Sequence, residues 1–379
     1  MDFELTEDQR MARDSARDFA EKRLKPLAQK FDEEEAIPRE VYEEAAALGF
    51  FGVLIPEAYG GLGLDHVAYA LVMEEISRVC AAFQVCLTVH NSLVASAIVR
   101  LGTDAQKSKY LPRMAKGEWI AAYSLSEPGS GSDAGSLKAS ARLDGDHWVL
   151  DGIKSWVSSA GFADLFLVFV STDKEKGSRG VSALLIEKGA PGLSLGKKER
   201  KLGIRGSDTR ELHFQACRVP KDGLIGVRDE GFKVALSVLD NGRVGIAAQA
   251  VGLAQAALEE GLAYAKTRRQ FGKALSEFQA IQFKLADMAK NVEAARLLTL
   301  NAARILSQGK KATKEASMAK LFASEAANRA AYDALQIHGG SGYVRELPIE
   351  RYFRDARITE IYEGTSEIQR LVIARELLR

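Results

Sequence analysis

The chain has 379 residues, of which 46% are hydrophobic and 27% are charged. This ordinary globular composition excludes disordered, collagen-like and low-complexity proteins, and the length predicts two or three packed units. Lysine and arginine outnumber aspartate and glutamate by only 52 to 51. Net charge therefore provides no general attraction for nucleic acid or an anionic membrane.

Local composition indicates neither a membrane segment nor a disulfide framework. The longest uninterrupted apolar runs, such as Leu165–Val170, are far shorter than the roughly 18 residues that a membrane helix needs. Acidic residues interrupt residues 1–20, which argues against a signal peptide. The three cysteines are odd in number and lack CxxC spacing, and no histidine has a spacing typical of a metal site. We expect a soluble cytoplasmic protein without metal; a processed mitochondrial protein is the alternative.

Residues 1–117 are expected to form a helical domain. Thr6 and Gln9 have the spacing of a capping box, in which the two side chains satisfy backbone N–H groups at a helix start. Met11, Phe19 and Leu27 follow at helical spacing. A loop rich in glycine and proline at 55–63 interrupts the pattern.

Residues 118–227 are expected to form an antiparallel β-domain, either a small barrel or a sandwich. Short segments rich in valine, phenylalanine and leucine alternate here with glycine, aspartate, serine and proline. The segments are Ala141–Leu150, Leu165–Val170, Val181–Ile186 and Glu211–Ala216.

Residues 228–379 are expected to be helical again, which gives the chain an α+β fold class. No proline occurs between Pro220 and Pro348, so long uninterrupted helices are allowed. A helix over about 313–336 is rich in alanine, which suits close helix packing. Before it, apolar residues at alternating steps of three and four predict a core seam: Phe278, Ile281, Leu285, Met288, Val292 and Ala295.

Three segments are candidates for chemistry. The first is the loop at 123–133, whose glycines and serines could turn N–H groups and hydroxyls inward to form an anion-binding nest. Most loops of this composition only connect elements, and the segment matches neither a Walker A sequence nor GxGxxG. A dinucleotide-binding βαβ fold is also opposed by the absence of βαβ alternation.

The second candidate is the segment at 154–161 around Trp156. An indole beside serine hydroxyls could shield a flat ring system while a hydroxyl binds it. Taken alone, the segment favours a tryptophan buried in the core of the β-domain.

The third candidate is Glu363. Ser366 and Gln369 have capping-box spacing, which predicts a helix starting just after Gly364, so Glu363 would lie in the preceding turn. A carboxylate there could act as a general base if burial raised its pKa. A solvated turn glutamate is the simpler interpretation without further context.

Together, in this order, these segments resemble the acyl-CoA dehydrogenase family over essentially the whole chain. The most specific marks are Ser126-Glu127-Pro128 with Gly131-Ser132-Asp133, the run at 336–343 and Tyr362-Glu363-Gly364-Thr365. Secondary marks lie at 56–61, 156–158 and 268–272. One departure is Ser124, where the family usually has a different small residue.

The resemblance implies a fold of three domains: N-terminal helices, a central β-domain and a C-terminal four-helix bundle. It also implies a homotetramer with one FAD per subunit. The residues expected to hold FAD within the chain are Tyr123, Leu125, Ser126, Gly131, Ser132, Trp156, Val157, Ser158, Thr365 and Glu367. Those expected to reach FAD from a neighbouring subunit are Arg268, Gln279, Gln336, Gly339 and Gly340, and Gln270 and Phe271 are also expected at the cofactor. Ser132, Asp240, Arg243 and Gly364 are expected to contact acyl-CoA.

The resemblance further implies an activity. Glu363 would remove the proton next to the thioester carbonyl while flavin takes hydride from the next carbon, giving a trans-2-enoyl-CoA, and electrons would pass to electron-transfer flavoprotein. Members that act on isovaleryl-CoA or long chains carry the base at the position of Gly242. A carboxylate at 363 and none at 242 therefore favour a short-, medium- or 2-methyl-branched-chain substrate.

Other functions also occur on this fold. An acyl-CoA oxidase would use the same base with oxygen as acceptor, but such chains are generally longer. A flavin monooxygenase lacks the catalytic carboxylate. A DNA-binding relative would carry a basic patch, which the balanced charge does not support.

Overall fold

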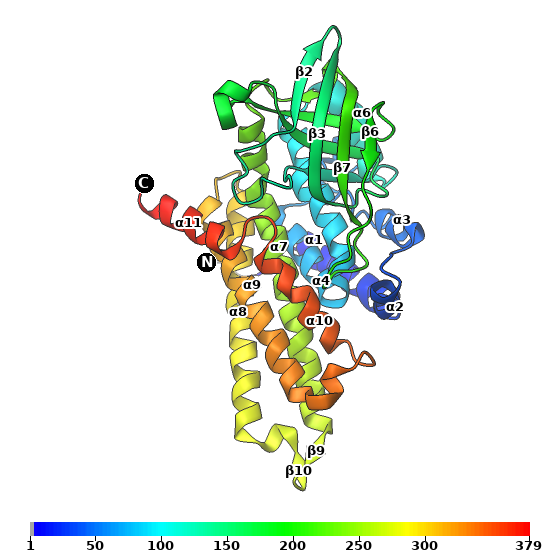
Figure 1. Cartoon of the computed structure of the whole chain (residues 1–379). Coiled ribbons are helices and arrows are strands. Elements are labelled where there is room, and N and C mark those ends of the chain that lie inside the picture. The colour runs from blue at the N-terminus through cyan, green and yellow to red at the C-terminus, as the bar shows by residue number, and fades with distance from the viewer. Residues whose placement is uncertain (1–3) are drawn as a thin grey trace.

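The computed structural model describes residues 4–379, and the chain forms a helical part, a sheet and a second helical part in sequence order (Figure 1). Thr6 caps the first helix with the expected capping box, which confirms that prediction. A π-helical turn at Ala20–Leu24 continues this helix. The helices of the first part are α1 (Glu7–Phe19), α2 (Ala28–Glu33), α3 (Arg39–Ala47), α4 (His66–Thr88), α5 (Ser96–Leu101) and α6 (Asp104–Ala115).

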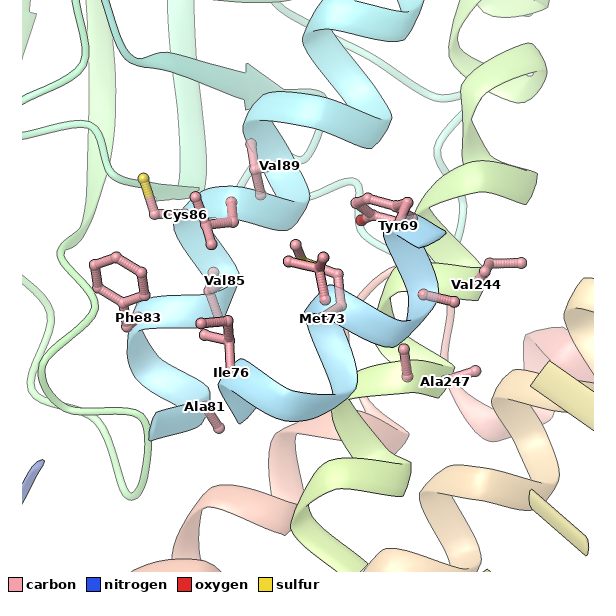
Figure 2. Packing of buried hydrophobic residues seen from close by; sticks show 14 of the residues in the cluster. Tyr69, Met73, Ile76, Ala81, Phe83, Val85, Cys86, Val89, Val244 and Ala247 are labelled. Atoms are coloured by element: carbon pink, nitrogen blue, oxygen red, sulfur yellow. The ribbon is translucent and has the colours of Figure 1, made fainter. Parts of the chain in front are cut away.

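Helix α4 is the centre of the first part and packs on the long helix α7 (Gly231–Thr267). Its backbone leaves helical geometry at Cys80, and a π-helical turn at Val89–Ala95 follows its C-terminus. Figure 2 shows the two halves of α4 on either side of this bend, with Tyr69 beside Val244 of α7. The stretch His66–Leu101 is long and apolar enough to cross a membrane, but 94% of its most apolar window is buried inside the molecule. It is a core helix of this fold.

The middle part is one eight-stranded sheet in the order β6-β7-β3-β2-β4-β5-β8, with β1 paired to β4. Most pairs are antiparallel as expected, but β1–β4 is parallel and β2 meets β4 in parallel at Ser140. The sheet encloses its own core, since Trp148, Phe166 and Phe214 from different strands share one buried cluster. The strands are β1 (Ala121–Ser124), β2 (Ser140–Asp144), β3 (His147–Ser158), β4 (Leu165–Ser171), β5 (Val181–Glu187), β6 (Leu193–Leu195), β7 (Thr209–Pro220) and β8 (Leu224–Ile225).

One predicted strand is wrong. The segment Ala141–Leu150 is a hairpin, because the chain turns between Asp144 and His147. Gly145 adopts φ +61° in this turn, a conformation that glycine reaches without steric cost.

The C-terminal part contains the three long helices α7, α8 and α9, which pack on one another, and two short helices that contact α9. The predicted seam of α8 is buried from Met288 onward, whereas Phe278, Ile281 and Leu285 are half-buried. A small hairpin joins α7 to α8 at the far end of the bundle from the sheet (Figure 1). The elements after α7 are β9 (Arg269–Gln270), β10 (Lys273–Ala274), α8 (Gln279–Ser307), α9 (Thr313–His338), α10 (Ile349–Ala356) and α11 (Ser366–Leu377).

Candidate active site

Glu363 lies in the tight turn that leads into α11. Its backbone is left-handed, with φ 52°, and Gly364 follows with φ 95°. A non-glycine residue in this region is strained by roughly 1 kcal/mol or more, and such strain concentrates at functional sites. The surrounding contacts must therefore hold this turn.

Thr365, the N-cap of α11, and Gln369 within α11 stabilise the turn in a different way from the predicted capping box. Thr365 is the N-cap, and its hydroxyl accepts from the N–H of Ile368 at 3.4 Å. Gln369 Nε2 donates to the carbonyls of Glu363 (3.1 Å) and Gly364 (2.9 Å). The predicted capping box of Ser366 and Gln369 is wrong, because Gln369 serves these carbonyls and the Ser366 hydroxyl has no partner.

Glu363 is half-buried, and its Oε2 atom is buried against Gly242 of α7. Its Oε2 atom has no hydrogen-bond partner in the structure. A Cβ atom built on Gly242 would lie 2.1 Å from this oxygen and 2.8 Å from Leu93 Cδ2, so only glycine leaves room for the carboxylate. Burial raises the pKa of Glu363 to about 7, against the opposing charges of Lys320 and Arg243. The simpler interpretation, a solvated turn glutamate, is wrong.

Further polar groups near Glu363 are also buried without a complete set of partners. Arg243 Nη1 pairs with Asp240 Oδ1 at 3.0 Å, and Thr313 donates to the other Asp240 oxygen at 2.6 Å. The Nε atom of Arg243 and the hydroxyl of Tyr123 have no hydrogen-bond partner. Burial raises the pKa of Tyr123, and the negative charge of Glu363 raises it further. Buried polar atoms of this kind normally meet a ligand or water. The structure thus brings Glu363, Arg243, Asp240 and Tyr123 together.

The loop at 125–132 leaves strand β1 directly beside these groups. Ser126 O accepts from Ser155 N at 2.9 Å, which ties the loop to β3. Beneath it, Lys154 Nζ donates to Leu125 O (2.9 Å) and to Glu127 Oε1 (2.8 Å). The other loop residues expected at FAD, Gly131 and Ser132, are exposed, and no atom lies within 4 Å of the place where a Cβ on Gly131 would be. The backbone there is open to a ligand.

Trp156 is not in the core of the β-domain. It is 65% exposed, while the neighbouring Trp148 is 2% exposed, so the prediction of a buried Trp156 is wrong. The cause is an irregularity in the pairing of β3 with β7 between Lys154 and Val157, where Trp156 adopts φ 62°. Val157 is buried and Ser158 half-buried. An exposed indole next to an open, serine- and glycine-rich loop fits a flat ring system such as a flavin.

The remaining predicted cofactor residues lie elsewhere. Arg268 and Gln279 lie at the far end of the bundle from the sheet, with the β9–β10 hairpin between them (Figure 1). All of the predicted cofactor residues at this end of the bundle are exposed, and Phe271 is 94% exposed. The C-terminal end of α9 meets this region, since His338 stacks on Tyr264 of α7 at 4.3 Å between ring centroids. The predicted cofactor residues at this end are Arg268, Gln270, Phe271, Gln279, Gln336, Gly339 and Gly340. Thr365 and Glu367 lie instead at the start of α11, beside Glu363.

Some groups of the site were not found from the sequence. Lys320 of α9 is fully buried and donates to Gly364 O at 2.8 Å. The sequence feature that could have indicated its burial is its position on the alanine-rich face of the helix, with Ala316, Ala319 and Ala323. Lys154 and Glu127 form a buried ion pair, with side chains 0% and 4% exposed.

The histidines and cysteines have structural positions. His90 is buried and accepts from Ala121 N at 3.2 Å, and burial lowers its pKa to about 3. Cys80, Cys86 and Cys217 are buried free thiols. Within residues 4–379, no group of three or more histidine, cysteine, aspartate or glutamate side chains is arranged to hold a metal ion.

The site combines a buried carboxylate oxygen with an open, serine- and glycine-rich platform, which fits the class of enzymes that hold a flat, anionic cofactor. The sequence matches the N-terminal, middle and C-terminal domains of acyl-CoA dehydrogenase over residues 6–118, 122–217 and 229–378. The chain belongs to the acyl-CoA dehydrogenase family, and it is an enzyme that oxidises a CH–CH bond.

Individual relatives match this chain over nearly all of its residues. The chain is 52% identical over 376 residues to short-chain specific acyl-CoA dehydrogenase of Bos taurus, covering 99% of this chain and 91% of the relative. Butyryl-CoA dehydrogenase of Megasphaera elsdenii is 43% identical with a TM-score of 0.98 and full coverage of both chains. A chain from a structure described as the electron transferring flavoprotein of Acidaminococcus fermentans is 46% identical with a TM-score of 0.99, again covering both chains completely.

Proposed function

We propose that this enzyme oxidises a short- or branched-chain acyl-CoA to the trans-2-enoyl-CoA, with Glu363 as the catalytic base. The observation that carries the proposal is the buried Oε2 atom of Glu363, which has no protein partner and lies over Gly242. A carboxylate with a pKa of about 7 is half ionised at neutral pH, and a general base works best near the pH at which it operates. The short-chain preference rests on the base position and on the names of the relatives.

The chain's own residues would act in three ways. Glu363 would accept the proton from the carbon next to the thioester carbonyl through its Oε2 atom, which is buried and has no partner in the structure. Arg243, Asp240, Gly364 and Ser132 would position the acyl-CoA. The left-handed turn would keep the carboxylate in place, because Gln369 and Lys320 bind its carbonyl groups.

FAD is the cofactor that this family uses, and it supplies the redox chemistry by accepting the hydride from the next carbon. Tyr123–Ser132 and Trp156–Ser158 would hold its flavin and pyrophosphate, since the exposed indole suits a flat ring and the open backbone suits an anion. Residues at the far end of the bundle would complete the site from a neighbouring subunit of a homotetramer. Phe271 and Tyr343, which are 94% and 84% exposed there, support that assembly.

We further propose electron-transfer flavoprotein as the electron acceptor and the cytoplasm as the location. The first rests on the solved Acidaminococcus chain, and the second is the expectation from the sequence, with a processed mitochondrial protein as the alternative. Mixing reduced enzyme with oxidised electron-transfer flavoprotein and following both flavin spectra tests the acceptor. Cell fractionation tests the location.

The base is tested by Glu363→Gln. This variant keeps the shape of the side chain, so it should bind FAD and butyryl-CoA as the native enzyme does. Anaerobic bleaching of the flavin should slow by about 10²–10⁴-fold or more, the typical contribution of a general base. Bleaching at the native rate would overturn the assignment of Glu363.

A further inference from the structure

Lys320 is a buried cation without an ion-pair partner. Its side chain is completely buried in α9, between alanine-rich turns. Within residues 4–379 no carboxylate oxygen lies within 4.0 Å of its ammonium group, in contrast to the buried Lys154, which pairs with Glu127 at 2.8 Å. An unpaired buried charge is costly to folding, so its presence calls for a compensating role.

The ammonium group of Lys320 reaches the turn that carries Glu363. Its Nζ donates to Gly364 O at 2.8 Å, and Gln369 Nε2 donates to the same oxygen at 2.9 Å. Gln369 also binds the carbonyl of Glu363 at 3.1 Å. Two elements, α9 and α11, therefore fix consecutive peptide units after Glu363, whose left-handed backbone would otherwise relax.

We propose that Lys320 is a positioning residue for Glu363: its ammonium holds the Gly364 carbonyl and supplies positive charge to the carboxylate from the side of α9. This inference rests on the proposed function, in which Glu363 is the base. Lys320 touches neither substrate nor cofactor in this scheme and acts through the turn.

Electrostatics agrees with this geometry. Lys320 is the largest charge that opposes the effect of burial on Glu363, and Glu363 is the largest charge that acts on Lys320. Burial lowers the pKa of Lys320 to about 8, and the carboxylate limits that fall. The other charged or titratable groups coupled to the pair are Arg243 of α7, Tyr123 of β1, Tyr69 of α4, Tyr362 and Glu360 of the preceding segment, and Glu367 of α11. Arg243 is in turn coupled to Asp240 of α7 and Arg375 of α11.

The test compares Lys320→Met with the native FAD-loaded enzyme. Methionine fills a similar volume and removes the charge and the hydrogen bond. The pH midpoint for anaerobic flavin reduction by butyryl-CoA should move upward by about one unit or more, which is at least tenfold in the proton-binding constant. A midpoint that stays at the native value in a folded, FAD-bound variant would overturn the proposal.

Two variants sharpen the comparison. Lys320→Arg keeps the charge, so its pH midpoint should stay close to the native one even where the rate falls. Lys284→Met is a matched control, because Lys284 of α8 pairs with Asp333, which lies on α9 as Lys320 does. The pH midpoint of this variant should not move. If Lys320→Met does not fold, Lys320→Gln is measured in the same way.

A second readout separates this proposal from the proposed function. Infrared difference spectra report the protonated carboxyl group of Glu363, assigned by its absence in Glu363→Gln. The titration of that band should move upward in Lys320→Met without any turnover. If Glu363→Gln reduced the flavin normally, the proposed function would fail while this titration still tested Lys320. An unmoved band would overturn the role of Lys320 alone.

Discussion

The Oε2 atom of Glu363 occupies the space that a side chain at Gly242 would need. A Cβ atom there would lie 2.1 Å from the oxygen, far inside any real contact. A glycine in the interior of a helix costs roughly 1 kcal/mol relative to alanine, so α7 gives up stability at this position. The missing side chain leaves space for the Glu363 carboxylate, so the glycine at position 242 of α7 is needed for the position of Glu363 in the turn before α11.

Gly242→Ala should therefore displace the carboxylate. The added methyl group must push Glu363 or Leu93 aside, and a base moved by about 1 Å can lose on the order of 10²-fold in rate. The measurement is the anaerobic rate of flavin reduction by butyryl-CoA, together with FAD content. A native rate would show that the carboxylate position is not critical.

Gly261→Ala is the matched control for this substitution. It lies on the same helix, and the atom nearest to the position of its added methyl group is Ala334 Cβ at 3.5 Å, an ordinary contact. Helix propensity alone predicts a gain of up to about 1 kcal/mol in the free energy of unfolding and no change in rate. The two substitutions thus separate the effect on the carboxylate from the effect on the helix.

Glu363→Gln should stabilise the protein at neutral and higher pH. The pKa of Glu363 is raised by burial from 4.5 to about 7, so between these values the folded state holds a proton that the unfolded state has released. Stability therefore falls as pH rises through this window, by on the order of 3 kcal/mol in all. The glutamine variant lacks this loss. Its Tm should exceed that of the native protein at pH 8 and match it near pH 4.5. An equal difference in Tm at the two pH values would contradict a raised pKa of Glu363 in the folded protein.

Prediction from sequence succeeded where the determining forces are local. The capping box at Thr6 depends on residues within one helical turn, and the long proline-free helices need no distant partner. The neighbourhood of Glu363 could not be predicted from the residues around it, because its burial depends on Gly242 of α7 and on the approach of α9. The exposure of Trp156 depends likewise on a pairing irregularity between β3 and β7 that its own segment does not reveal.

Trp156→Ala should weaken FAD binding with little effect on folding. The indole is 65% exposed, so its removal takes away little buried area. Trp148→Ala is the contrasting variant, because Trp148 is 2% exposed in the core of the sheet and its loss should cost about 3–5 kcal/mol. Equilibrium dialysis of FAD and thermal unfolding of the apoprotein distinguish the two. Unchanged FAD affinity in Trp156→Ala would contradict the proposed position of the cofactor.

Lys154→Met should loosen the loop that is proposed to hold FAD. The Lys154 ammonium binds both Leu125 O and Glu127, and Glu127 in turn accepts from the N–H groups of Lys138 (2.7 Å) and Ala139 (3.0 Å). Removing one member of a buried pair leaves the other charge unpaired, which typically costs about 3–5 kcal/mol. We expect a lower Tm and loss of FAD on dilution, measured by flavin fluorescence. Lys138→Met should change neither, because its exposed side chain lies farther along the connection between β1 and β2. Full FAD retention in Lys154→Met would show that the loop keeps its shape without the pair.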